Sequence, residues 1–109
     1  MNNVTIIGDG GWGTALALVL KRNENNVTVW GYSSENIDLI NKKQENVNYL
    51  PNIPIPHNIR WTSSPKEAVS SADVIVIVVP SKFFEKTIKI FSPFLSKEQL
   101  IISATKGID

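Results

Sequence analysis

The sequence contains no cysteine and only one histidine, His57, among its 109 residues. The absence of cysteine excludes disulfide bonds and thiolate metal sites. One histidine also leaves little room for a metal cluster or for a serine–histidine catalytic triad. We therefore expect no metal site, and we expect His57, which lies in a proline-rich segment, to be a surface residue.

The sequence also lacks a strong charge imbalance and a long apolar run. The net charge is +1, so neither nucleic acid nor an anionic membrane is an expected partner. The apolar run from Ala15 to Leu20 is too short to span a bilayer, and it follows Asp9 and glycines instead of the basic segment of a signal peptide. With 42% hydrophobic and 19% charged residues, the composition is that of a globular domain. We expect one soluble, cytoplasmic domain.

Short β-branched and apolar runs predict strands near residues 4–7, 27–30, 59–62, 74–79 and 100–102. The run at 74–79 is continuously apolar, which is typical of a strand buried on both faces. Between residues 46 and 58 the three prolines Pro51, Pro54 and Pro56 predict an extended loop.

Amphipathic segments predict helices between these strands. The first has an apolar face at Trp12, Ala15, Leu16, Val19 and Leu20. The second is capped by Ser33 or Ser34, and a short third one begins at Pro65 and runs through Ser70. The fourth is capped by Ser81, and its sheet-facing side is expected to carry Phe83, Phe84, Thr87, Ile88 and Phe91.

This alternation predicts an α/β fold, a Rossmann-type doubly wound and mainly parallel sheet with helices on both faces. The expected strand order is 3-2-1-4-5, with one dinucleotide-binding domain over residues 1–109. Because the sequence stops near the end of the fifth strand, we expect it to be the N-terminal part of something longer.

The join between the first strand and the first helix reads IIGDGGWGTALA, with Gly8, Gly10 and Gly13 at G-x-G-x-x-G spacing. In a strand–turn–helix join the first glycine permits a tight turn. The second lets a pyrophosphate approach the main chain, and the third lets the helix pack close to the strand. The helix N-terminus then offers unpaired N–H groups to the phosphates. The strand-before, helix-after context that this motif requires is present, so we expect a dinucleotide.

The end of the second strand leaves NAD and NADP both open as the cofactor. NAD-binding folds usually place an acid there, on the ribose hydroxyls. Here the sequence after Trp30 is GYSSE, with neither an acid nor an arginine directly after the strand. Tyr32 is able to stack on adenine, with Ser33 or Ser34 near the ribose or its 2′-phosphate.

Four ordered stretches resemble the bacterial-type NAD(P)-dependent glycerol-3-phosphate dehydrogenases. They are GDGGWGTALA at 8–17, NYLPNIPIP at 48–56, VIVIVVPS at 74–81 and SATKGI at 103–108. The resemblance covers the whole chain. It implies a Rossmann domain that is followed, in the family, by an all-helical domain which this sequence does not contain.

The resemblance also implies roles for matching positions. Gly11 and Trp12 fall where the family contacts the cofactor phosphates. Tyr32 falls at the adenosine end, and Tyr49 lies in a loop that borders the cofactor.

Further along the chain, Pro80 and Ser81 follow the fourth strand at its carboxyl end, where ligands sit in a doubly wound sheet. Lys106 falls where the family places a lysine that touches both the substrate and the nicotinamide end. The family's general acid is a lysine of the helical domain, so no catalytic acid or base is expected in this chain.

The sequence departs from the family at two positions. The family usually has a small uncharged residue where Asp9 stands, and a carboxylate beside the pyrophosphate should repel it unless the side chain points away. The family commonly has serine where Gly11 stands, so a hydroxyl contact to phosphate is absent. Both departures bear on cofactor affinity.

The implied activity of the full enzyme is the interconversion of dihydroxyacetone phosphate and sn-glycerol 3-phosphate, which feeds phospholipid synthesis. For the full enzyme we expect a homodimer. Two alternatives remain at this point. One is a stand-alone dinucleotide-binding or sensing module, and the other is the first domain of a related hydroxy-acid dehydrogenase.

Overall fold

The computed structural model describes residues 2–104, which form a five-stranded sheet, a two-stranded sheet, four α-helices and one 3-10 helix. In chain order the elements are β1 (Asn3–Ile7), α1 (Gly11–Arg22), β2 (Asn26–Trp30), α2 (Ser34–Lys43), β3 (Glu45–Asn46), β4 (Leu50–Pro54), β5 (Arg60–Thr62), α3 (Pro65–Val69), β6 (Val74–Ile77), α4 (Ser81–Phe91), η1 (Ser92–Phe94) and β7 (Leu100–Ser103).

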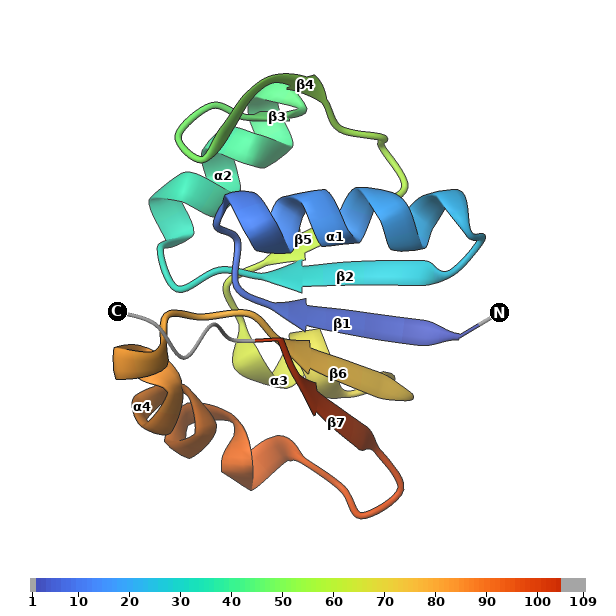
Figure 1. Ribbon diagram of the computed structural model, residues 1–109, viewed down its shortest axis with the longest axis vertical. Coiled ribbons are helices and arrows are strands. Elements are labelled where there is room, and N and C mark those ends of the chain that lie inside the picture. Colours follow the sequence, from blue (N-terminus) through green and yellow to red (C-terminus); the bar gives the residue numbers. More distant parts are fainter. Residues whose placement is uncertain (1, 105–109) are drawn as a thin grey trace.

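The large sheet is parallel throughout and has the order β5-β2-β1-β6-β7. Counted along the chain, this is the expected order 3-2-1-4-5, and the predicted doubly wound fold is confirmed. The central strand β1 pairs with β2 on one side and with β6 on the other. All five strands therefore present their carboxyl ends at one edge of the sheet, on the left in Figure 1.

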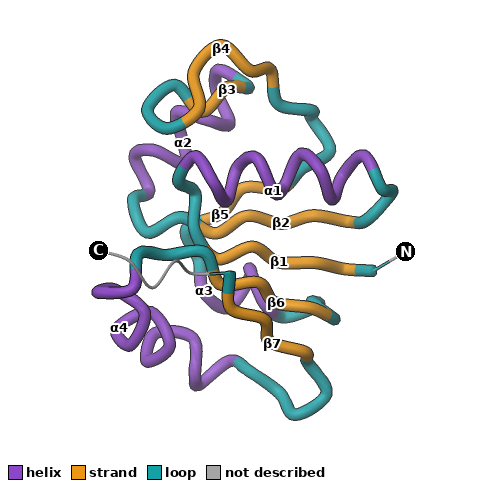
Figure 2. Tube along the Cα trace, viewed as in Figure 1, coloured by secondary structure: helices purple, strands orange, loops and turns teal. Residues whose placement is uncertain are grey.

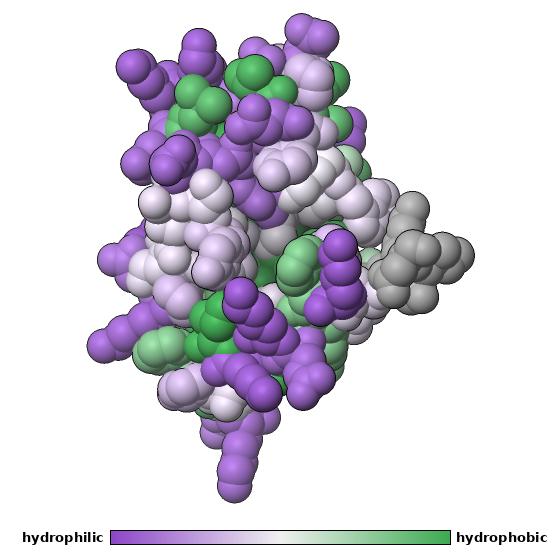
Figure 3. All heavy atoms as spheres, turned by 90° about the vertical axis from the view of Figure 1, so that its left-hand side faces the viewer, coloured by the Kyte–Doolittle hydropathy of each residue, from purple (hydrophilic) through white to green (hydrophobic). Residues whose placement is uncertain are grey.

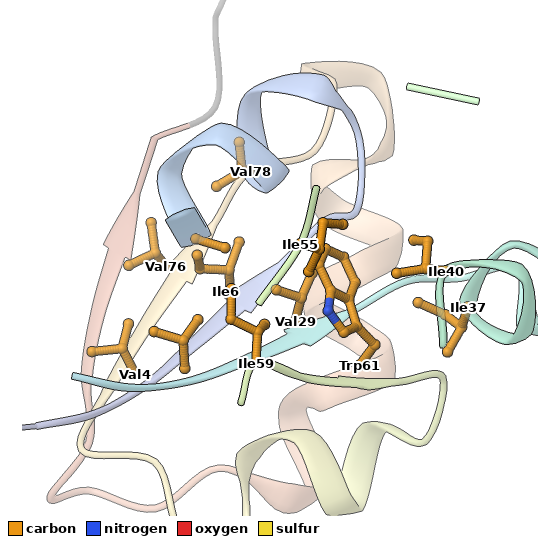
Figure 4. Packing of buried hydrophobic residues seen from close by; sticks show 12 residues of the cluster. Val4, Ile6, Val29, Ile37, Ile40, Ile55, Ile59, Trp61, Val76 and Val78 are labelled. Carbon is orange, nitrogen blue, oxygen red and sulfur yellow. The ribbon is translucent and has the colours of Figure 1, made fainter. Parts of the chain in front are cut away.

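Alternate residues of the central strands build a core on each face of the sheet, because successive side chains of a strand point to opposite faces. One core contains Val4 and Ile6 of β1, with α1, α2 and Trp61 packed over them. Figure 4 shows Ile37 and Ile40 of α2 pointing toward this cluster.

The second core lies on the opposite face, under α3 and α4. It contains Ile7, Trp30, Ile75 and Ile77 from the strands and Phe91 from α4. The predicted burial of the fourth strand on both faces is confirmed, because Ile75, Val76 and Ile77 are all buried.

Helix α1 buries only part of the face that the sequence predicts, because Leu16 and Leu20 pack on the first core but Trp12 and Val19 do not. Trp12 and Val19 are 55% and 43% exposed, whereas Gly13, Thr14 and Ala17 are buried. The reason is close packing, because α1 lies so near to β1 that only small side chains fit between them. The largest apolar residues of a stripe are therefore not always the buried ones.

The segment expected to be an extended loop instead contains an antiparallel hairpin, β3–β4. Pro51 and Pro54 lie in β4, and this is possible because a two-stranded sheet leaves alternate N–H groups unpaired. Figure 2 shows the hairpin next to the end of α2, which it contacts. Both Ile55 and Ile59, just beyond the hairpin, are buried in the first core.

The helix starts agree with the sequence at two of three places. Ser33 caps α2 by accepting a hydrogen bond from the N–H of Asn36 at 3.2 Å, and Pro65 begins α3. The expectation that Ser81 caps α4 is wrong, because Pro80 is the N-cap and Ser81 is the first helical residue. Among residues 2–104, no helix is both long enough and apolar enough to cross a membrane.

Candidate functional site

A cleft of about 490 Å³ opens at the carboxyl edge of the sheet, within the size range of small-molecule sites. Its walls come from the glycine turn after β1, the ends of β2 and β6, the β3–β4 hairpin and one side of α4. The lining residues are Gly8, Asp9, Gly10, Trp30, Tyr32, Tyr49, Val78, Val79, Pro80, Phe83, Lys86, Thr87 and Ile90. Figure 3 faces this edge and shows apolar residues, in green, at the surface among hydrophilic ones in purple.

Gly8 makes the tight turn that leaves β1. Its φ is +132°, a region that residues with a Cβ rarely adopt. A Cβ at Gly8 would lie 2.2 Å from the carbonyl oxygen of Val78. The Gly8 N–H donates to the carbonyl of Trp30 at 2.8 Å, so the turn is fixed directly against the ends of β2 and β6.

Gly13 and Gly10 have opposite surroundings. A Cβ at Gly13 would lie 2.2 Å from the carbonyl oxygen of Gly8, whereas a Cβ at Gly10 would meet no atom within 4 Å. Gly13 therefore serves the packing of α1 on the strand, as its place in the motif predicts. Gly10 faces open space on the wall of the cleft, and the motif predicts a pyrophosphate there.

The N-terminus of α1 is available to an anion. Gly10 is the N-cap, no side chain caps the helix, and the first turn contains no acidic residue. The first main-chain helical bond runs from the Thr14 N–H to the Gly10 carbonyl at 2.9 Å. The N–H groups of Gly11, Trp12 and Gly13 precede that bond, so this end of the helix carries the partial positive charge that favours phosphate.

The β3–β4 hairpin is fastened to the glycine turn by Asn46. The side-chain amide of this residue, which is fully buried, donates to the Asp9 carbonyl at 2.7 Å and to Thr14 Oγ1 at 2.8 Å. The carbonyl oxygen of Tyr49 lies 2.8 Å from the place of a Cβ on Gly11. A side chain at position 11, where the family commonly has serine, would therefore clash with the Tyr49 carbonyl in this chain, and glycine avoids that clash.

The carboxylate of Asp9 turns toward the first turn of α2. Its Oδ2 accepts a hydrogen bond from the side-chain amide of Asn36 at 2.7 Å. The sequence left open whether this side chain faces the start of α1, and the structure directs it instead toward the end of β2.

Aromatic side chains also line the cleft. Tyr32 is 69% exposed, and the Lys86 ammonium lies 5.3 Å from the centroid of its ring. Trp30 forms a buried floor, with Phe91 edge-on to it at 4.8 Å. Exposed aromatic faces above an apolar floor suit the stacking of a planar ring such as adenine.

Helix α4 contributes residues to the cleft that the sequence analysis did not assign to a site. The expectation that Phe83 packs against the sheet is wrong, because its ring is 47% exposed and lines the cleft, whereas Phe84 packs on the core as predicted. Lys86, Thr87 and Ile90 lie on the same side as Phe83. The i, i+3, i+4, i+7 spacing of these four residues is the signal that marks a second face of α4.

The structure therefore brings Gly8, Gly10, Tyr32, Tyr49 and Pro80 together around one cleft. The N-terminal end of α1, formed by Gly11, Trp12 and Gly13, adjoins this cleft. Lys106 lies outside the described residues. His57 is exposed, as predicted. Among residues 2–104, no group of three or more histidine or acidic side chains is placed to hold a metal ion.

Comparison with known proteins identifies the family to which the site belongs. Residues 3–109 match the family model described as the NAD-dependent glycerol-3-phosphate dehydrogenase N-terminus. The chain belongs to this family. The match runs through all four stretches that carry the resemblance in the sequence.

The sequences and structures of individual glycerol-3-phosphate dehydrogenases are similar to this chain. The chain is 44% identical over 109 residues to the NAD(P)+ enzyme of Bacillus subtilis, covering 100% of this chain and 32% of that protein. A crystal structure of the enzyme from Coxiella burnetii superposes with a TM-score of 0.92 at 36% identity, over 98% of this chain and 33% of that one. The enzyme from Saccharomyces cerevisiae gives a TM-score of 0.88 at 29% identity, over 99% and 34%. The chain thus spans about a third of the length of these relatives.

Proposed function

We propose that this chain is the dinucleotide-binding domain of an oxidoreductase that interconverts dihydroxyacetone phosphate and sn-glycerol 3-phosphate. The observation that carries the proposal is the open space over Gly10, at an uncapped helix N-terminus on the wall of the cleft. Family membership supports the same substrate pair, because the similar proteins are named glycerol-3-phosphate dehydrogenases.

The chain's own residues have distinct parts in this proposal. The N–H groups at the start of α1 would bind the pyrophosphate, and Gly10 would let it approach the main chain. Tyr32 and Phe83 would hold the adenine by stacking. Tyr49 and Pro80 would border the bound molecule, and this chain would thereby fix its position relative to the substrate.

A bound nicotinamide dinucleotide supplies the hydride for this class of reaction. Lys106 would hold the phosphate or hydroxyl of the substrate as a compact positive charge. The general acid and most of the substrate pocket would come from a helical domain that follows this one. The reaction would take place in the cytoplasm, and its product would feed phospholipid synthesis.

The test compares the 109-residue chain with a longer protein that also carries the region corresponding to the remainder of the relatives. The short chain should bind NADH or NADPH in calorimetry and show no turnover of dihydroxyacetone phosphate. The longer protein should oxidise the reduced dinucleotide. Turnover by the short chain would overturn the two-domain proposal, and failure of the longer protein to use dihydroxyacetone phosphate would overturn the proposed substrate.

A further inference from the structure

The carboxylate of Asp9 lies where a side chain on Gly31 would lie if residue 31 were not glycine. A Cβ built on Gly31, directly after β2, would lie 2.5 Å from Asp9 Oδ2 and 2.6 Å from Asp9 Cγ. The carboxylate from the glycine turn therefore stands where the first atoms of a residue-31 side chain would stand. Gly31 and Asp9 are sterically matched, because any larger residue at position 31 would displace the acid.

This place has a defined role in dinucleotide-binding folds. An acid at the end of the second strand accepts hydrogen bonds from the ribose hydroxyls of NAD, and the 2′-phosphate of NADP requires a cation there instead. In this chain β2 ends at Trp30 and is followed by Gly31 and Tyr32, and none of these three residues is charged. Asp9 lines the same cleft as Trp30 and Tyr32, so it brings a carboxylate to this position from a different segment of the chain.

The carboxylate is held in place by the buried side-chain amide of Asn36, which is itself hydrogen-bonded to the exposed Asn48. Asn36, which is 6% exposed, donates to Asp9 Oδ2 at 2.7 Å, and its own carbonyl oxygen accepts from the Asn48 amide at 2.8 Å. Within residues 2–104, Asp9 Oδ1 accepts no hydrogen bond. One oxygen is thus anchored, and the other remains an acceptor for a ligand hydroxyl.

We infer that Asp9 makes this site selective for NAD(H) over NADP(H). The inference rests on the proposed function, since it concerns which dinucleotide the same cleft accepts. The carboxylate accepts a hydrogen bond from an adenosine ribose hydroxyl, whereas a 2′-phosphate would bring close to two further negative charges next to it. Among the described residues that line the cleft, Lys86 is the other charged one, and its ammonium lies over the face of the Tyr32 ring.

The test measures the dissociation constants of NADH and NADPH by calorimetry for the 109-residue chain. Asp9→Asn keeps the size of the side chain and an oxygen for the Asn36 amide, and removes only the charge. The matched control is Asp38→Asn, the same change on an exposed part of α2 that does not line the cleft. The wild-type chain should bind NADH at least about tenfold more tightly than NADPH, as expected for like charges in contact near a surface.

Asp9→Asn should reduce this preference by about tenfold, mainly by tightening NADPH, and added salt should narrow the difference between the wild type and Asp9→Asn. The Asp38→Asn chain should keep the wild-type ratio. A wild-type chain that binds NADPH as tightly as NADH, or an Asp9→Asn chain with an unchanged ratio, would overturn the inference while leaving the proposed function intact. If neither dinucleotide binds the wild-type chain, the proposed function and the inference fail together.

Discussion

The side-chain amide of Asn46 donates a hydrogen bond to the main-chain carbonyl of Asp9 at 2.7 Å. This contact joins the β3–β4 hairpin to the turn that carries the dinucleotide motif, and Thr14 Oγ1 completes it by accepting from the same amide. The shape of the turn therefore depends on a residue far beyond the motif.

Replacement of Asn46 by alanine should lower the free energy of unfolding by about 1–3 kcal/mol, because the part-buried Asp9 carbonyl and the buried Thr14 hydroxyl lose the Asn46 donor. NADH binding should weaken as well, since the turn loses its support. Urea denaturation measures the first effect and calorimetry the second. The control is Asn58→Ala at an exposed site, which should change stability by less than about 0.5 kcal/mol. An Asn46→Ala chain as stable as the wild type would show that the hairpin does not support the turn.

Replacement of Gly10 by valine should remove dinucleotide binding without unfolding the chain. The φ of Gly10 is −67° and a Cβ there meets no protein atom, so the substitution fits the folded protein and fills the space proposed for the pyrophosphate. The affinity for NADH should fall at least about a hundredfold, which is about 2.7 kcal/mol. Calorimetry and thermal unfolding give the two readouts. Undiminished NADH binding would place the ligand elsewhere.

Replacement of Gly13 by alanine, unlike replacement of Gly10 by valine, should mainly lower the stability of the chain. The new Cβ would lie 2.2 Å from the Gly8 carbonyl oxygen, so α1 must move away from β1. We expect a loss of about 1–3 kcal/mol of stability from this overpacking, although alanine favours helices over glycine by about 1 kcal/mol. Urea denaturation measures the change, with Gly10→Val as the matched control from the same motif. A stabilised Gly13→Ala chain would contradict the packing role.

Replacement of Lys106 by alanine tests the role that family resemblance gives to this residue. In the longer protein we expect a higher KM for dihydroxyacetone phosphate and a lower kcat, with a smaller change in NADH affinity, because the lysine is proposed to hold the substrate. Steady-state kinetics that follow NADH oxidation would show this. Wild-type kinetics in Lys106→Ala would remove the residue from the proposed site.

The fold could be predicted from the sequence because local patterns and chain connectivity specify it. Five apolar runs separated by amphipathic segments leave few topologies once crossovers are right-handed. The motif predicted the tight turn at Gly8 and the close packing of α1 on β1 at Gly13. Both features require a residue without a Cβ, so the spacing of the glycines indicates them.

The details of the cleft could not be predicted in the same way, because they depend on contacts between distant segments. Nothing near Asp9 in the sequence indicates that its carboxylate lies over Gly31, and nothing near Asn46 indicates its two acceptors in the first turn of the chain. The exposure of Trp12 has a similar origin, because the tight packing of α1 on β1 overrode the apolar periodicity. The predicted homodimer remains a prediction.

The central place of β1 in the sheet has a consequence for how the protein folds. Val4 pairs with Val27 on one side and with Val74 on the other, so β1 has both of its neighbours only when a segment about 70 residues further along the chain reaches it. Folding that depends on such distant pairings is slow, because the chain loses the entropy of closing a long loop before the contacts form. The cleft residues that follow β2 and those that follow β6 can meet only after β6 has paired with β1. The ability to bind a ligand therefore appears at the end of folding.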